Sequence, residues 1–348
     1  MKTVFIQSRP IGKNNSCFII AEAGVNHNGD FSMAKKLVDT AVKVGADAIK
    51  FQTYKAERFV SENAHRAVYQ TDSTGDESQL EMLKKYELSD EEFKELADYA
   101  NSKGIVFLST PFDIQSAELL HEIGVGAFKI GSGDLTDLPL LKKVASWGTP
   151  MIISTGMSTI EEIEESLHAV KKGGCNEVIL LHCTSSYPVR PKDANISLIP
   201  VLRDRFNLHT GFSDHTKSTV IPAAAVALGA VIIEKHFTLD NDLPGPDHKM
   251  SLNSQEFREM IDNIREIEVA LGDGVKKITE EEKGIMNVAR KSIVAAFEIP
   301  KNTVIIREML SVKRPGTGLP PCEIDKIIGK KTIRKIQKDS LIKWVDLQ

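Results

Sequence analysis

Residues 18–53 read FIIAEAGVNHNGDFSMAKKLVDTAVKVGADAIKFQT, and this stretch decides how the chain is expected to fold. It opens with an apolar, β-branched run (18–23) and closes with a second one (48–53). Between them, 32–44 carries apolar residues at helical spacing and ends at Gly45, a residue type at which helices often stop. A strand, a helix and a strand in this order predict two parallel strands joined by a crossover helix.

The same unit repeats along the chain to about residue 271. Strands that alternate with helices predict a parallel sheet, and eight such units match the size of a (β/α)8 barrel, which is typically about 250 residues. An open, doubly wound sheet is the structural alternative. The strand-like runs are 18–23, 48–53, 105–110, 127–132, 151–155, 178–184, 209–213 and 231–237, and amphipathic segments between them include 32–44, 90–103, 159–172 and 222–228.

Two helices are expected to begin with a capping box, in which a hydroxyl residue and a glutamate three positions later satisfy each other's backbone N–H groups. The pairs are Ser89 with Glu92, and Ser158 with Glu161. The segment 54–89 interrupts the pattern, and it is polar and expected to be poor in helix. A long insertion after a barrel strand is predicted to cover the active face.

The texture changes near the C-terminus, where short strand-like runs (292–296 and 304–306) and tight turns replace the long helices. We therefore expect a barrel domain at 1–275, a linker at 276–289 and a small β-rich domain at 290–348.

Composition excludes several classes of protein. The chain has 348 residues and a net charge of −4 without a basic cluster, so no nucleic-acid partner is expected. Its longest apolar stretch, 221–233, is shorter than the roughly 20 residues that span a membrane. The N-terminus lacks the apolar core of a secretory signal, and the four cysteines show no paired spacing. These features predict a cytoplasmic protein with buried, reduced thiols.

Polar side chains stand at the end of every predicted strand. In a barrel of this type the carboxyl ends of the strands meet on one face, where active sites lie. A single polar residue at such a place is weak evidence, but eight strand ends together are hard to explain by solvation. In chain order the ends carry Glu22, Lys50 with Gln52, Thr110, Lys129 with Ser132, Ser154, Ser185, Ser213 with His215, and Glu234 with His236.

Lys50 and Lys129 stand where a core residue would be ordinary, so each could be a lysine whose stem packs while its amine reaches water. The functional interpretation is a cradle for a phosphate or carboxylate, because lysine binds such anions as a point charge and hydroxyl groups complete the hydrogen bonds. The hydroxyls placed to contribute are those of Ser132, Ser154, Ser185 and Ser213.

His215 and His236 end neighbouring strands and could converge on a divalent ion that keeps water and substrate oxygens as its other ligands. They could equally be structural or bind substrate directly. Glu22 and Asp134 are the candidate carboxylates for proton transfer, although Glu22 could simply cap a loop. Asp134 follows Gly131-Ser132-Gly133, where glycines allow a ligand to approach the backbone.

Long motifs in this order resemble the sialic acid synthase family over nearly the whole chain. The tail with SVKRPGTGLPP (311–321) is similar to the antifreeze-like C-terminal (SAF) domain of that family. The other matching segments are IIAEAGVNHNGD (19–30), IKFQTYKA (49–56), FLSTPFD (107–113), FKIGSGD (128–134), IISTGMST (152–159), LLHCTSSYP (180–188), GFSDHT (211–216), IEKHFTLD (233–240) and PGPDHKMSL (244–252).

The resemblance implies a (β/α)8 barrel whose small domain is swapped across a homodimer. It implies that His215 and His236 bind Mn²⁺ or Mg²⁺, and that Arg314 reaches the N-acetyl end of the sugar from the partner subunit. It implies phosphoenolpyruvate contacts from Lys50, Thr110, Lys129, Ser132, Ser154, Ser185 and Ser213, and sugar contacts from Glu22, Gln52, Tyr187 and Asp247.

The implied reaction joins phosphoenolpyruvate to N-acetylmannosamine and water, giving N-acetylneuraminate and phosphate. A 2,4-diacetamido-2,4,6-trideoxy sugar, giving legionaminate, is the alternative acceptor. Lys50 and Lys129 would stabilise the departing phosphate, and Asp134 or Glu22 would move protons. Two positions depart from the family pattern, since Asp134 is often glutamate and Ser185 can be asparagine.

Two rival functions remain open. An aldolase-type lyase would use Lys129 or Lys50 as a Schiff-base nucleophile on pyruvate. A non-catalytic protein would use the tail to bind ice or glycan, but the complete set of polar strand ends argues against it.

Overall fold

The structure is a computed structural model that describes residues 1–62, 64 and 78–348. It consists of two compact units, Met1–Gly272 and Asp273–Gln348. Within the described residues, no helix is both long and apolar enough to cross a membrane.

The first unit is a (β/α)8 barrel, as predicted. All neighbouring strands of its eight-stranded sheet are parallel, in the order β5-β4-β3-β10-β9-β8-β7-β6. The first barrel strand pairs with the last, and the end strands β5 and β6 lie in contact, so the sheet is nearly closed and the open-sheet alternative is wrong. The strands are β3 (Phe18–Gly24), β4 (Ala48–Thr53), β5 (Val106–Pro111), β6 (Phe128–Ile130), β7 (Met151–Ser154), β8 (Val178–Cys183), β9 (His209–Asp214) and β10 (Ile232–His236).

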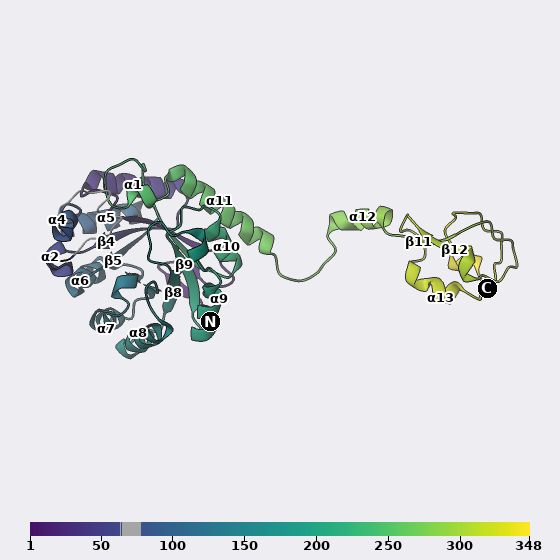
Figure 1. The fold of residues 1–348 in the computed structure, drawn as a ribbon, viewed down its shortest axis with the longest axis horizontal. Helices are drawn as coiled ribbons and strands as arrows, with labels where there is room; N and C mark the ends of the chain where they lie inside the picture. Colours follow the sequence, from purple (N-terminus) through teal and green to yellow (C-terminus); the bar gives the residue numbers. More distant parts are fainter. Residues whose placement is uncertain (63, 65–77) are drawn as a thin grey trace. The chain divides into compact units, whose positions relative to one another are not determined.

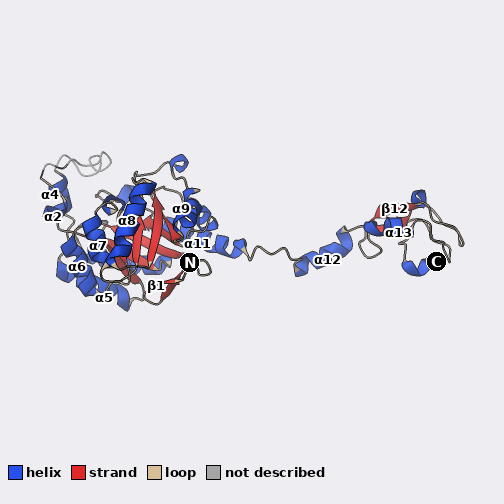
Figure 2. Cartoon of the chain, turned by 90° about the horizontal axis from the view of Figure 1, so that it is seen from below, coloured by secondary structure: helices blue, strands red, loops and turns tan. Residues whose placement is uncertain are grey.

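Helices surround these strands (Figures 1 and 2). A cluster of buried apolar side chains fills the layer between strands and helices, to which α1 contributes Leu37 and Val38. That helix begins where the Asp30 carboxylate accepts backbone N–H bonds, and it ends at Gly45 with a left-handed φ of 88°. The long helices are α1 (Phe31–Val44), α5 (Asp90–Ser102), α6 (Ile114–Ile123), α7 (Leu138–Ala145), α8 (Ile160–Gly173), α9 (Leu198–Phe206), α10 (Ile221–Ala227) and α11 (Ser254–Leu271).

One of the two predicted capping boxes is confirmed and the other is wrong by one residue. Ser89 and Glu92 form a box at the start of α5. At α8 the box joins Thr159 and Glu162, while the Ser158 hydroxyl donates to a carbonyl two residues back. Adjacent hydroxyl residues each have a glutamate three positions later, so the extended backbone at Thr159 decides which one caps the helix.

An N-terminal hairpin, which the sequence pattern did not reveal, closes the barrel at the end where the strands begin. Its strands β1 (Val4–Ile6) and β2 (Arg9–Ile11) pair antiparallel. Ile6 and Ile11 belong to the same buried cluster as Phe18, at the start of β3. Because this end is filled with apolar side chains, the polar strand ends form the opposite face.

The insertion at 54–89 contains two short helices in its described part, α2 (Ala56–Phe59) and α4 (Gln79–Lys84). Residues 63 and 65–77 lie outside the described residues, so the prediction that the insertion covers the site concerns in part a segment that is not described. The described part packs on the barrel through Met82 and Leu83, which cluster with Val25.

The second unit has its own small core, which includes Ile293, Ile299 and Ile305. Its strands β11 (Ser292–Ala295) and β12 (Leu310–Lys313) pair antiparallel, and the predicted strand at 304–306 makes only an isolated bridge from Val304. The expected linker at 276–289 contains helix α12 (Glu280–Ala289). The remaining elements are α13 (Ile324–Ile327) and the 3₁₀ helices Ser132–Asp134, Pro191–Asp193, His248–Met250, Arg307–Met309, Pro321–Glu323 and Trp344–Asp346.

All four cysteines are free thiols. Cys17, Cys175 and Cys183 are buried, as expected, but Cys322 is exposed, so the prediction of buried thiols is wrong for that residue. It lies in a 3₁₀ turn of the second unit, whose core is too small to cover every short apolar side chain.

Candidate active site

A cavity of about 730 Å³ opens at the carboxyl ends of the barrel strands. In barrels of this kind, the residues at this face form the active site. The cavity is large enough for two small substrates. It is lined by every residue of the first unit that the sequence predicted for the site except Asp134: Glu22, Lys50, Gln52, Thr110, Lys129, Ser132, Ser154, Ser185, Tyr187, Ser213, His215, His236 and Asp247.

Four buried charges form the floor of the cavity. The Lys50 ammonium lies 2.8 Å from Glu22, and the Lys129 ammonium lies 3.2 Å from Glu234. Glu234 also faces Lys50 at 3.8 Å, so it bridges the two lysines. In the sequence Glu234 is a polar residue at a strand end, for which no role is predicted. Its position two residues before His236 was the available signal, because alternate residues of a strand point to the same face.

Burial and charge set the protonation of this cluster. Burial raises the pKa of Glu22 to about 7, against the attraction of Lys50. Burial also opposes ionisation of Glu234, but the two lysines outweigh it and hold the pKa of Glu234 below its usual value. Burial lowers the pKa of Lys129, whereas the pKa of Lys50 is raised because its two carboxylate neighbours outweigh its burial. Near neutral pH Glu234 is therefore charged beside the two lysines, whereas Glu22 is close to its own pKa.

Hydroxyl groups surround the lysines. Thr110 accepts a hydrogen bond from Lys50 at 2.9 Å, and Ser213 donates one to Glu234 at 3.1 Å. The buried Ser154 hydroxyl has no hydrogen-bond partner among the described residues, which leaves it available to a ligand.

Gly156 allows two further hydroxyls to converge. A Cβ atom at this position would lie 2.3 Å from the Ser185 oxygen and 2.8 Å from the Ser132 oxygen. The backbone N–H of Gly156 donates to Ser132 at 3.0 Å. A backbone N–H and two hydroxyls in one place are groups that phosphate oxygens accept from.

The two predicted metal ligands lie side by side, with ring centroids 5.4 Å apart. His215 Nδ1 lies 2.9 Å from the Thr184 carbonyl, to which it can only donate, so Nε2 has a free lone pair when the ring is neutral. Burial opposes the charged form of His215, but Cys183 and the Thr184 carbonyl outweigh it and raise the pKa of the ring. His236 is buried, which lowers its pKa well below the usual value and keeps it neutral. Its Nδ1 is buried without a hydrogen-bond partner among the described residues.

Two neighbouring imidazoles fit a divalent ion that takes its other ligands from water or substrate, because each has a nitrogen available when its ring is neutral. Among the described residues, no group of three or more histidine, cysteine, aspartate or glutamate side chains is arranged to hold a metal. His215 and His236 are thus the two candidate ligands among the described residues.

The four residues predicted to bind the sugar also line the cavity. Tyr187 packs against His215, with ring centroids 4.2 Å apart. Gln52 donates to Glu22 at 3.4 Å, and Asp247 is buried, which raises its pKa to about 6. The Cβ position at Gly24, whose φ is +53°, lies 3.4 Å from the Glu22 and Gln52 side chains and 3.6 Å from Asp247. These three polar groups thus meet around one glycine.

Two predicted residues lie outside the cavity lining. Asp134 closes a short 3₁₀ helix after β6, and burial raises its pKa to about 7. One of its oxygens is buried without a hydrogen-bond partner among the described residues. Arg314 belongs to the second unit, where it is exposed and donates to the Ala289 carbonyl at the end of α12.

Comparison with known proteins finds one family model on the barrel and a second one on the tail. The NeuB family matches residues 37–276, and the SAF domain matches residues 290–348. The chain is 46% identical to N,N'-diacetyllegionaminic acid synthase of Campylobacter jejuni, over 93% of this chain and 98% of that protein. It is 37% identical to N-acetylneuraminate-9-phosphate synthase of Mus musculus, over 96% and 93%.

Among solved structures, the chain resembles the N-acetylneuraminic acid synthetase of Leptospira borgpetersenii. The TM-score is 0.74 and the identity 37%, and the match covers 82% of this chain and 95% of that one.

Proposed function

The chain belongs to the NeuB family, the family of sialic-acid-type synthases, and from that premise we propose that it condenses phosphoenolpyruvate with an N-acetylated mannose-type sugar. The observation that carries the proposal is the buried group of Glu22, Lys50, Lys129 and Glu234 at the base of a cavity lined with hydroxyls. Two buried lysines suit a substrate that carries both a phosphate and a carboxylate.

In the proposed reaction a bond forms between C3 of phosphoenolpyruvate and the aldehyde carbon of the open-chain sugar. Water adds to C2, and the bond between C2 and the phosphate oxygen breaks. Of the two protons of that water, one ends on the former aldehyde oxygen and the other leaves with phosphate. Lys50 and Lys129 hold the anion and stabilise the charge of the departing phosphate.

Glu22 is placed to move protons, because its pKa of about 7 lets it exchange a proton near neutral pH. Asp134 has a similarly raised pKa, and we propose it as the second proton-transfer group. Its path to the substrate would run past Ser132 and Gly133, which line the cavity beside it.

We propose that His215 and His236 hold Mn²⁺ or Mg²⁺. A divalent ion supplies Lewis-acid polarisation of a substrate oxygen when bound. The contribution of the chain is to orient both imidazoles, His215 through its bond to the Thr184 carbonyl and both through the packing of Tyr187. Burial also keeps His236 neutral.

Two acceptors are candidates. From the sequence, N-acetylmannosamine is the expected acceptor, with Asp247 as a partner for a sugar hydroxyl. Both acceptors keep a hydroxyl at C3, so Asp247 fits either. We favour 2,4-diacetamido-2,4,6-trideoxymannose, because the chain resembles a diacetyllegionaminic acid synthase most of the way along its length and because Val25, Met82, Leu83 and Phe112 give the cavity an apolar side.

We also propose a homodimer in which Arg314 acts in trans at the N-acetyl end of the sugar. Its support is the resemblance of the tail to the SAF domain and the exposed guanidinium on a loop that α12 braces through the Ala289 carbonyl.

Mass spectrometry of the product from phosphoenolpyruvate and a panel of acetylated hexosamines tests the function. We expect a nine-carbon 2-keto acid with release of one phosphate per product. One observation favours the aldolase alternative: burial lowers the pKa of Lys129, and a Schiff-base lysine needs a lowered pKa. Borohydride trapping of the chain by pyruvate, without phosphate release from phosphoenolpyruvate, would support that alternative instead.

A further inference from the structure

One side of the cavity is apolar. Val25, Met82, Leu83 and Phe112 all line it. The first three belong to one cluster of buried apolar side chains, and Phe112 packs against that cluster. These four residues, which we call the apolar wall, come from the loop after β3, from α4 and from the loop after β5.

The apolar wall borders the polar groups proposed for the acceptor. Val25 directly follows Gly24, the glycine around which the side chains of Glu22, Gln52 and Asp247 meet. A sugar whose hydroxyls are bound by these groups therefore has part of its remaining surface next to the wall.

Aromatic packing supports the wall from behind. The Tyr54 hydroxyl donates to the Leu83 carbonyl at 3.2 Å. The Tyr54 ring meets the Phe112 ring edge-on at 6.0 Å, and Phe59 packs against Phe112 at 4.5 Å. The position of Leu83 is thus tied to the ends of two barrel strands.

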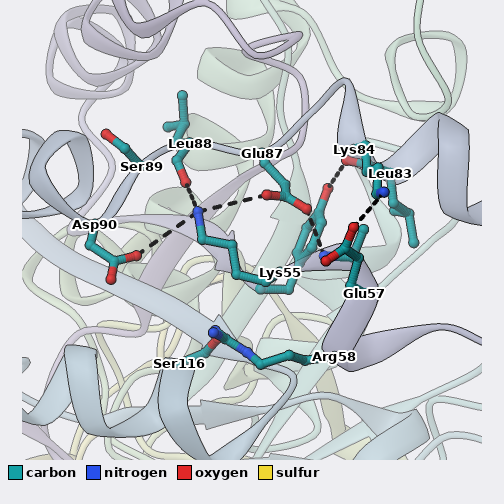
Figure 3. A network of polar contacts seen from close by, with 12 residues as sticks. Lys55, Glu57, Arg58, Leu83, Lys84, Glu87, Leu88, Ser89, Asp90 and Ser116 are labelled. Atoms are coloured by element: carbon teal, nitrogen blue, oxygen red, sulfur yellow. Dashed lines mark hydrogen bonds and ion pairs between the residues drawn. The ribbon is translucent and has the colours of Figure 1, made fainter.

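Polar contacts hold the insertion that carries Leu83 (Figure 3). Lys55 donates to the Leu88 carbonyl at 3.0 Å and faces the Glu87 carboxylate at 3.7 Å. Lys84, the residue after Leu83, pairs with Glu57 at 2.6 Å. These contacts fasten α4 and the loop after it to α2 and the residue before it, so Met82 and Leu83 are presented from a braced segment.

We propose that the apolar wall determines acceptor specificity by binding methyl groups of the acceptor, namely those of acetamido groups or of a 6-deoxy carbon. A hydroxyl in that place would lose its water partners without gaining a hydrogen bond, whereas a methyl group gains apolar burial. A difference of one methyl group in an apolar pocket is typically worth roughly 10–200-fold in kcat/KM. The inference rests on the proposed condensation and names the surface that selects its acceptor.

The test compares Leu83→Gln with Leu80→Gln, the same change on the same helix at a residue that packs against the same cluster but does not line the cavity. Phosphate release is measured with N-acetylmannosamine and with 2,4-diacetamido-2,4,6-trideoxymannose. We expect Leu83→Gln to lower the ratio of kcat/KM for the diacetamido sugar over N-acetylmannosamine by about tenfold or more. Leu80→Gln should leave the ratio unchanged, and the KM for phosphoenolpyruvate should stay the same in both variants.

An unchanged ratio in active Leu83→Gln would overturn the inference. If circular dichroism shows that this variant is unfolded, Leu83→Thr replaces it with the same expectation, because threonine brings a hydroxyl in a smaller volume. A wild-type chain that releases no phosphate with either sugar would overturn the proposed condensation and this inference with it, so the two failures are told apart by the wild-type assay.

Discussion

The Lys235 ammonium lies 2.6 Å from the Asp214 carboxylate, and both side chains are buried, with exposed fractions of 1% and 0%. Each residue directly precedes one of the two histidines of the cavity, His215 and His236. Because successive residues of a strand point to opposite faces, the ion pair lies on the side of the strands away from the histidines, where it ties β9 to β10. The Asp214 carboxylate also accepts from the backbone N–H of Thr216 at 2.8 Å.

We expect Lys235→Met to destabilise the protein strongly, because it leaves the Asp214 carboxylate buried without its counter-charge. Removing one partner of a buried pair typically costs about 3–5 kcal/mol. Chemical denaturation measures the loss. The double variant Lys235→Met with Asp214→Asn is the control, since its neutral pair should recover most of the stability. In that folded control, weaker Mn²⁺ binding by titration would show that the ion pair also positions the histidines.

Metal removal is the next test. Chelation should abolish phosphate release, and Mn²⁺ or Mg²⁺ should restore it. His215→Ala and His236→Ala should each lose activity and Mn²⁺ binding while circular dichroism shows an intact fold, because both side chains border the cavity rather than the apolar core. Full activity of either variant in excess chelator would contradict the assignment.

Asp134 should affect both turnover and the pH dependence of stability. Its pKa is about 7 in the folded chain against an ordinary value of 3.8, so between these pH values the folded state binds more protons than the unfolded state. Stability is therefore lost as pH rises through that window, by at most about 1.4 kcal/mol per pH unit from this group. Denaturation at several pH values should show a flatter slope for Asp134→Asn.

The same variant should lower kcat by about 10²–10⁴-fold, the usual contribution of a proton-transfer group, with little change in the KM for phosphoenolpyruvate. A loss confined to KM would make Asp134 a binding residue only.

Gly156→Ala should raise the KM for phosphoenolpyruvate by at least tenfold, because the new methyl group would occupy the space where the Ser132 and Ser185 hydroxyls converge. Steady-state kinetics with saturating sugar measure it. Gly284→Ala is the control, since a Cβ atom there also meets nothing within 4 Å and Gly284 does not line the cavity. An equal effect of both variants would argue against the hydroxyl cradle.

Arg314→Ala and His236→Ala should each be nearly inactive alone, yet recover part of the activity when co-expressed. A mixed dimer can hold one complete site only if Arg314 comes from the other subunit. Verified heterodimers without recovery would count against action in trans.

The amino-acid sequence by itself determined the barrel and most of the cavity lining. Strand and helix periods alternate eight times, and parallel strands bring their carboxyl ends to one face. Residues near the ends of predicted strands, such as Lys50 and His236, therefore face one common cavity. Local pattern was enough because the alternation of side chains along a strand is a property of the backbone.

Tertiary structure alone decided which of these groups interact. Glu234 bridges two lysines, and Lys235 pairs with Asp214. Both arrangements depend on the register and spacing of strands that are far apart in the chain. The apolar wall joins Val25 to Leu83 in the same way. The protonation state of the site residues also depends on the tertiary structure, since burial raises the pKa of Glu22. Distance and burial are properties of packing between elements, and no local pattern of residues contains them.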